Sequence, residues 1–171
     1  MSTSITTLES YLHETWSPDR EFVDGEILER TLGEKDHSSW QMALSLLLAS
    51  YRHSANIRVF PELRLQTQLT RFRVPDIMVI DRNAPNEQII THPPLLCVEI
   101  LSPDDRLHHL TDKVAEYFQM GVRAVWIIDT RKQVGYQCSG PAMHDWNASP
   151  VLSVPDTSIS IEMSAIIADL D

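Results

Sequence analysis

Apolar residues recur along the chain at two spacings, one typical of amphipathic helices and one typical of buried strands. Near the start, Ile5, Leu8, Leu12 and Trp16 follow one another at helical spacing and predict a short helix. A longer and mostly apolar segment, WQMALSLLLASY, predicts a second helix. The helices predicted in this way cover residues 5–16, 38–51, 103–120 and 163–170.

Apolar runs bounded by turn residues predict strands. The run LLCVEIL, residues 95–101, is apolar at every position but one, which is the pattern of a strand covered on both faces. Asp24-Gly25 lies between the apolar-containing arms of residues 21–31 and is a strong signal for a two-residue hairpin turn. The other predicted strands cover residues 57–66, 73–81, 123–129, 134–138 and 158–161.

The third predicted helix has clear signals at both ends. Ser102 suits the N-cap, Pro103 the first helical position, and the two aspartates that follow complement the positive end of the helix dipole. Gly121 suits the left-handed residue that ends a helix. Because a predicted strand stands on each side of this helix, the segment reads as a βαβ unit. We therefore expect a single mixed α/β domain over residues 1–171.

Composition narrows the class of protein. The chain has 171 residues, 43% hydrophobic and 22% charged, as expected of one globular domain with a core. No window approaches the roughly 18 consecutive apolar residues of a transmembrane helix, and the first residues lack the pattern of a secretory signal. Two cysteines are too few for a disulfide framework. The expected location is the cytoplasm, without a membrane partner.

The charge of the chain is −10 overall but is unevenly distributed. An acidic protein does not grip nucleic acid by bulk electrostatics, because the phosphate backbone favours basic surfaces. Residues 52–82 reverse the balance, since their six arginines exceed their three acids. These arginines are either solvated side chains on strand surfaces or one side of a phosphate-binding surface.

Two carboxylates stand in apolar strands. Glu99 is the polar residue of the run at 95–101, and Asp76 follows Val74-Pro75 and precedes an equally apolar run. An ionised carboxylate buried in such a strand costs several kcal/mol unless a cation compensates it. Considered singly, each acid also has a purely structural explanation. Asp76 could cap a turn, and Glu99 could lie at a solvated strand end or pair with a buried arginine. Taken together, the two acids are what Mg²⁺ requires, since it binds one or two carboxylates with water and phosphate oxygens.

Lys113 is the third candidate. It flanks the apolar stripe that Leu110, Val114 and Tyr117 form on the helix after Glu99, so its ammonium group can reach over the sheet towards that acid. The alternative is a lysine whose stem covers apolar surface while its charge stays in water.

Four segments carry a resemblance to a known family. They are Val74-Pro75-Asp76, residues 94–103 (PLLCVEILSP), Lys113 with Tyr117, and residues 121–129 (GVRAVWIID). Together they resemble the Uma family of putative restriction endonucleases, within the PD-(D/E)XK nuclease superfamily. The resemblance extends over nearly the whole chain and includes the Asp24-Gly25-Glu26 hairpin and His37 ahead of the second helix.

The resemblance implies a restriction-endonuclease-like fold, in which helices flank a mixed β-sheet core behind an N-terminal helix and hairpin. It implies Asp76 and Glu99 as Mg²⁺ ligands, with Mn²⁺ as a substitute. One position departs from the superfamily pattern, because Leu101 stands where a lysine is expected two residues after the second acid. In this family the lysine is displaced to the next helix, which here means Lys113.

Three further residues are secondary candidates. His37 either orients water or substrate near the metal or forms a hydrogen bond at a helix N-terminus. Glu26 and Glu62 are possible further carboxylates, although an exposed acid is the ordinary reading of a hairpin residue such as Glu26. The chain has no Gly-rich phosphate loop, CxxC pair, HExxH or GxSxG motif, which argues against P-loop, zinc and serine-hydrolase chemistry.

The function expected from these observations is Mg²⁺-dependent hydrolysis of phosphodiester bonds in nucleic acid, with DNA as the expected substrate. Asp76, Glu99, Lys113 and His37 are the predicted catalytic residues, and Asp76 and Glu99 the predicted metal ligands. The alternative is a catalytically silent nuclease-fold module for binding or assembly, which the net charge and the displaced lysine favour. Double-strand cutting usually needs two active sites, which makes a homodimer an attractive assembly, although the sequence does not give the oligomeric state.

Overall fold

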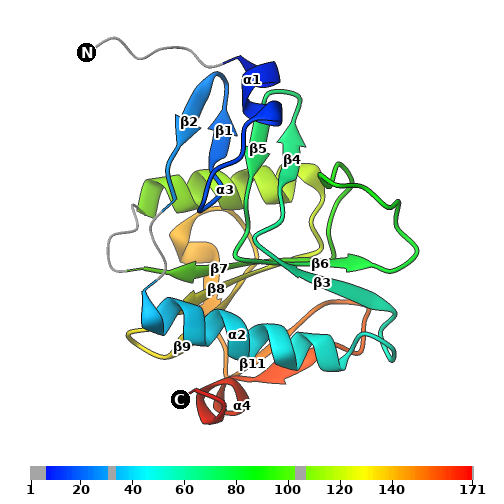
Figure 1. The fold of residues 1–171 in the computed structure, drawn as a ribbon. Helices are drawn as coiled ribbons and strands as arrows, with labels where there is room; N and C mark the ends of the chain where they lie inside the picture. Colours follow the sequence, from blue (N-terminus) through cyan, green and yellow to red (C-terminus); the bar gives the residue numbers. More distant parts are fainter. Residues whose placement is uncertain (1–6, 31–33, 103–106, 171) are drawn as a thin grey trace.

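The computed structural model describes residues 7–30, 34–102 and 107–170, and it forms a mixed sheet with helices on both faces and a smaller sheet beside it (Figure 1). Its helices are α1 (Leu8–His13), α2 (Lys35–Ser50), α3 (Leu107–Met120) and α4 (Met163–Ala168), with a short 3₁₀ helix at Met143–Asp145. Within the described residues, no helix has the length and apolar character needed to cross a membrane.

The large sheet has six strands, and β7 and β8 at its centre are parallel while every other neighbouring pair is antiparallel. In spatial order the strands are β10 (Trp146–Ala148), β9 (Val134–Cys138), β8 (Ala124–Asp129), β7 (Leu96–Leu101), β6 (Ile77–Asp81) and β3 (Ile57–Pro61). Helix α3 connects β7 to β8, which confirms the predicted βαβ unit. The helix ends before Gly121, whose φ of 91° is easily reached only by a residue without a Cβ.

Helices α2 and α3 cover opposite faces of the large sheet, as Figure 1 shows. Alternate residues of β7 divide between two cores: Val98 and Ile100 pack with α2, whereas Cys97 packs with α3. Glu99 has the parity of Cys97, because side chains two residues apart share a face of a strand. It therefore lies on the α3 face.

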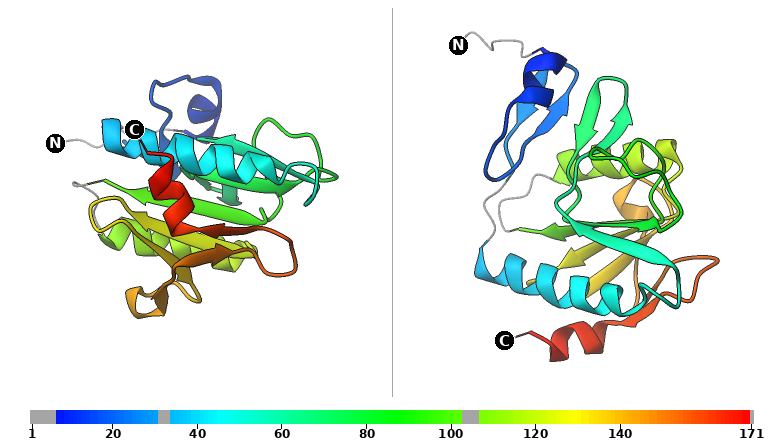
Figure 2. Two further views of the ribbon diagram at one scale, coloured as in Figure 1. Left: turned by 90° about the horizontal axis from the view of Figure 1, so that it is seen from below. Right: turned by 45° about the vertical axis from the view of Figure 1, so that its right-hand side comes forward.

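The small sheet and α1 stand together next to α3, on the side away from α2 (Figures 1 and 2). The sheet consists of β2 (Glu26–Leu28), β1 (Glu21–Val23), β5 (Arg71–Arg73) and β4 (Leu65–Gln68), all antiparallel. A third cluster of buried aromatic side chains, Tyr11, Phe22 and Phe72, packs it against α1. The last two strands, β11 (Val151–Ser153) and β12 (Ser160–Glu162), form a hairpin whose Leu152 and Ile161 pack in the α2 core.

Several predicted elements are confirmed. The hairpin turns at Asp24 and Gly25, both with positive φ (50° and 97°), as a two-residue turn requires. Helix α2 begins three residues earlier than predicted and ends one residue earlier, and the predicted strands at 123–129 and 134–138 match β8 and β9 closely. The described part of the first helix is shorter than predicted, because α1 ends at His13. The predicted start of the third helix, after Ser102, lies at residues 103–106, outside the described residues.

Two predicted strands are wrong in their continuity. The run at 57–66 is divided at Glu62, whose φ of 50° turns the chain out of the large sheet (β3) and into the small one (β4). The run at 73–81 also spans both sheets, since Arg73 ends β5 and β6 begins at Ile77. An apolar pattern indicates that a segment is buried, but it does not indicate which sheet the segment joins. These two crossings bring the small sheet against the large one.

Candidate active site

Asp76 and Glu99 face each other across β6 and β7. The antiparallel register pairs Ile77 with Val98, so the next position brings Asp76 opposite Glu99. Asp76 also has the parity of Met78 and Ile80, which pack in the core under α3. Both acids are buried, at 6% exposure each. The two acids therefore lie on the same face of the sheet, on neighbouring strands, as the prediction of a shared site requires.

The two acids line a cavity of about 360 Å³ between the small sheet and the end of the large one. The titratable side chains that line it include Glu21, Arg30, His37, Asp76, Glu99 and Lys113. They come from β1, the segment after β2, the start of α2, the position just before β6, strand β7 and helix α3. All four predicted catalytic residues are therefore in one cavity.

Asp76 accepts hydrogen bonds at both carboxylate oxygens. Arg30 Nη2 donates to Oδ1 at 2.8 Å, and the backbone N–H of Ile100 donates to Oδ2 at 2.7 Å. Nε2 of His37 lies 3.4 Å from Oδ2. Burial would raise the pKa of Asp76, but the hydrogen bond with His37 and the charges of Lys113 and Arg30 lower it below its ordinary value. Asp76 is thus ionised at neutral pH.

The pKa of Glu99 is shifted in the opposite direction to that of Asp76. Its carboxylate accepts hydrogen bonds from Lys113 Nζ and from the hydroxyl of Tyr117, both at 2.6 Å. Burial is nevertheless the largest influence, and together with the negative charges of Asp76 and Glu21 it raises the pKa of Glu99 to about 7. Two carboxyls with pKa values on either side of the ordinary value allow one to stay charged while the other exchanges a proton.

Lys113 is held between two carboxylates. Its Nζ lies 2.6 Å from Glu99 Oε2 and 2.9 Å from Glu21 Oε1. Burial would lower the pKa of Lys113, but the charges of Glu21, Glu99 and Asp76 raise it above its ordinary value. The predicted reach of this lysine towards Glu99 is confirmed, and its ammonium group is a fixed positive charge inside the cavity.

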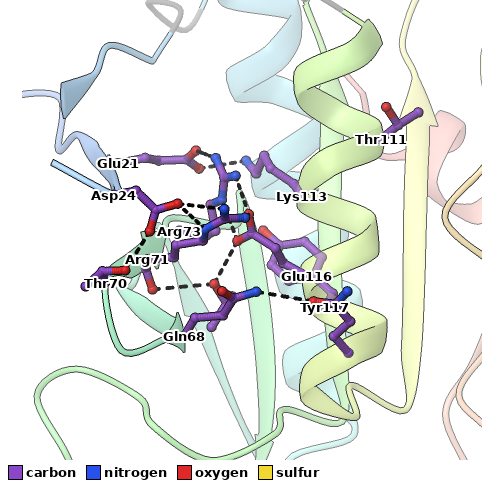
Figure 3. Close-up of polar contacts among 12 residues, drawn as sticks. Glu21, Asp24, Gln68, Thr70, Arg71, Arg73, Thr111, Lys113, Glu116 and Tyr117 are labelled. Carbon is purple, nitrogen blue, oxygen red and sulfur yellow. Dashed lines mark hydrogen bonds and ion pairs between the residues drawn. The ribbon is translucent and has the colours of Figure 1, made fainter. Parts of the chain in front are cut away.

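Behind Lys113, a buried ion network ties the small sheet to α3 (Figure 3). Arg73 lies 2.9 Å from Glu21 through Nη1 and 2.6 Å from Glu116 through Nη2, and its Nε donates a second hydrogen bond to Glu116 at 2.8 Å. Arg71 adds ion pairs to Glu116 at 3.0 Å and to Asp24 at 2.6 Å. The network fixes the position of Glu21, and Glu21 in turn helps to hold Lys113.

Three of the six arginines of the basic stretch pair with acids inside the protein. Arg71 and Arg73 belong to this network, and Arg64 pairs with Asp19 at 2.6 Å while its guanidinium lies 4.6 Å from the ring centroid of Tyr11. These three side chains are therefore neither solvated on strand surfaces nor arranged as a phosphate-binding surface.

A divalent cation fits this cavity only in a limited way. Among the described residues, no group of three or more His, Cys, Asp or Glu side chains is placed to hold a metal ion together. The available set is the carboxylate pair Asp76 and Glu99, hard oxygen donors of the kind that Mg²⁺ shares with water and phosphate. Because Arg30 and Lys113 contact these carboxylates, an incoming cation competes with two cationic side chains.

Of the three secondary candidates, only His37 lines the cavity. His37 lies in the cavity beside Asp76. Glu26 is exposed on the hairpin and does not line the cavity. Glu62 is 43% exposed and approaches the site only through Arg30, with its Oε1 3.6 Å from Arg30 Nη1.

Three residues that contact the predicted site residues were not predicted from the sequence: Glu21, Arg30 and Tyr117. Glu21 precedes two apolar residues of β1, a weak signal of burial that was available. Tyr117 was assigned to the apolar stripe of α3, and its hydroxyl gave no separate signal. Arg30 has no local pattern that predicts a partner, because Asp76 lies 46 residues further along the chain.

A mixed sheet flanked by helices, with a carboxylate pair and a lysine in one cavity, is the architecture of a restriction-endonuclease-like protein. The sequence pattern of the Uma2 family, described as "Putative restriction endonuclease", matches residues 8–162, and the chain belongs to this family. No curated protein matches it in sequence.

Solved structures support the fold. The crystal structure of "a putative nuclease belonging to DUF820" from Anabaena variabilis superposes with a TM-score of 0.81 at 24% identity, covering 96% of this chain and 99% of that one. A cryo-EM structure of a DrdV–DNA complex overlaps with a TM-score of only 0.42 at 15% identity, covering 80% of this chain and 11% of that one. The first match shows a shared fold, and the second is too weak to support an argument.

Proposed function

We propose that this protein is a Mg²⁺-dependent endonuclease that hydrolyses phosphodiester bonds of nucleic acid, with DNA as its substrate. The observation that carries the proposal is the convergence of Asp76, Glu99 and Lys113 on one cavity. The family and the fold support a nuclease.

Asp76 and Glu99 would hold the metal, with the Ile100 carbonyl as a possible further oxygen. When bound, Mg²⁺ supplies a Lewis acid that lowers the pKa of a water molecule and offsets charge on phosphate oxygens.

Lys113 contributes a positive charge that is already in place. Its ammonium group is fixed by Glu21 and Glu99, so it needs no reorganisation as negative charge grows on the phosphate. In the metal-free protein the pKa of Glu99 is raised to about 7 by burial, so near neutral pH a proton competes with the cation for this carboxylate. His37 sits beside Asp76 and is suited to orient water or substrate.

The direct test is cleavage of supercoiled and single-stranded DNA in Mg²⁺ or Mn²⁺. We expect Asp76→Asn and Glu99→Gln each to lower turnover by roughly 10²-fold or more, the scale seen when one stabilising group is removed. Glu26→Gln is the matched control, because it removes an exposed acid outside the cavity. Equal turnover of all three variants and the wild type would overturn the assignment.

The second candidate function is a catalytically silent module that binds or assembles with other molecules. The net charge of −10 and the displaced lysine favour it. If the wild type cleaves none of these substrates with either metal and takes up no Mn²⁺, the silent module becomes the better account. If the protein cuts both strands of a duplex, we expect a homodimer, which its mass in solution would reveal.

A further inference from the structure

Arg30 lies in the candidate site without a role in the function proposed above. It follows β2, lines the cavity, and keeps only 12% of its side chain exposed. One end of its guanidinium group is committed, since Nη2 donates to Asp76 Oδ1 at 2.8 Å.

The other end of the guanidinium group has no such partner. Arg30 Nη1 is buried and forms no hydrogen bond with the described residues. Its nearest ionic contact among them is Glu62 Oε1 at 3.6 Å, which is beyond hydrogen-bonding range. A buried N–H donor without an acceptor is costly, so a cavity-lining arginine in this state is a strong binding group for an incoming anion.

The end of Arg30 that contacts Asp76 is also relevant to metal binding. Asp76 is one of the two proposed metal ligands, and the guanidinium group now neutralises it. A divalent cation at Asp76 would take over that neutralising role and leave Arg30 Nη2 without its acceptor, with the partly exposed Glu62 as the acid nearest to the other end of the group. Phosphate oxygens satisfy both needs, because a guanidinium fork matches them in geometry and in charge.

We propose that Arg30 exchanges partners within the site: it neutralises Asp76 in the absence of a divalent cation and binds a phosphate oxygen of the nucleic acid once the cation is bound. This inference rests on the proposed function and adds a substrate-binding residue to it. It also assigns the small sheet, through the segment after β2, a direct part in substrate binding.

The exchange predicts opposite effects of one mutation on two ligands. Arg30→Met should bind Mn²⁺ alone roughly tenfold more tightly than the wild type, because the guanidinium group no longer competes with the metal for Asp76. The scale follows from carboxylate pKa values, which a cation within about 4–6 Å shifts by roughly one to three units. The same variant should bind a short labelled DNA duplex about tenfold or more weakly in Ca²⁺, which replaces Mg²⁺ to slow turnover. In EDTA, where Asp76 holds the guanidinium group, the mutation should change DNA affinity little.

Arg64→Met is the matched control. It removes another partly buried arginine that pairs with an aspartate, Asp19, but that does not line the cavity. It should leave the affinities for Mn²⁺ and for DNA unchanged. Calorimetry measures the first affinity and fluorescence anisotropy the second.

Arg30→Lys tests the proposal if Arg30→Met does not fold. It keeps the charge but loses the fork, so Mn²⁺ affinity should stay near the wild-type value while DNA affinity in Ca²⁺ falls. Weaker Mn²⁺ binding by Arg30→Met, or unchanged DNA binding by both variants, overturns the partner exchange and leaves the proposed nuclease intact. A wild type that binds neither Mn²⁺ nor DNA overturns the exchange and the proposed function together.

Discussion

Replacing Glu99 by glutamine should stabilise the metal-free protein above neutral pH. The side chain keeps its size and can still accept a hydrogen bond from Tyr117, while the desolvated negative charge disappears. Lys113 loses one partner but retains Glu21 at 2.9 Å. The wild type therefore bears a penalty for ionising Glu99 that the variant lacks.

The pKa of Glu99 sets both the size and the pH range of this effect. Burial raises that pKa from 4.5 to about 7, and each pKa unit is worth about 1.4 kcal/mol. Between these two values the unfolded chain has released the proton and the folded protein still holds it, so wild-type stability falls as pH rises. The fall, and with it the gain of Glu99→Gln, reaches about 3 kcal/mol at most. This figure already includes the attraction of Lys113, which is one of the influences on the pKa of Glu99.

Urea denaturation at several pH values, in EDTA and in Mg²⁺, measures the difference in the free energy of unfolding. It should be near zero at pH close to 4.5, grow towards pH 7 and remain constant above it. Mg²⁺ should diminish it, since the wild type gains more stability from binding the ion. Glu26→Gln, at an exposed position, should have no such profile. If Glu99→Gln matches the wild type at every pH, the acid is not desolvated in the way described.

Three further variants test the network and the packing around it. Lys113→Met should lower turnover by roughly 10²-fold or more in the DNA cleavage assay. It should also lower the free energy of unfolding by about 3 kcal/mol at neutral pH, because it leaves the buried Glu99 without its cation. Arg73→Met should cost about 3–5 kcal/mol in urea denaturation, because it removes the buried cation shared by Glu21 and Glu116. A loss below 1 kcal/mol would show that the network matters little. Gly135→Ala should cost about 1–3 kcal/mol, since an added Cβ would lie 2.5 Å from Met163 Sδ and 2.9 Å from Leu152 Cδ1. An unchanged melting temperature of Gly135→Ala would contradict this steric argument.

The parts of the site that the sequence predicts are those governed by local pattern. A lone acid in an apolar strand, as at Glu99, signals a compensated charge, because an isolated one is too costly. The helical stripe beside Lys113 limits the direction of its side chain. Both inferences use spacing within one strand or one helix.

The parts that could not be predicted depend on which segments meet. Arg73 ends a strand of the small sheet, and nothing in the run at 73–81 indicates that the chain changes sheets before Ile77. Arg30 and Glu21 meet their partners in the large sheet and α3 only because that change brings the two sheets together. Ion pairs between such distant segments leave no periodic trace in the sequence.

These distant pairs explain why the small sheet and the large sheet form one functional unit. Without the small sheet, Asp76 would lose Arg30, and Lys113 would lose Glu21. Glu116 would lose its contacts with Arg71 and Arg73 and remain buried without a cation. The loss is greatest at Glu116, because a buried charge without a partner costs several kcal/mol. The carboxylate pair alone is therefore only part of the site, and the cationic side chains that contact it, Arg30 and Lys113, come from the segments on either side of it.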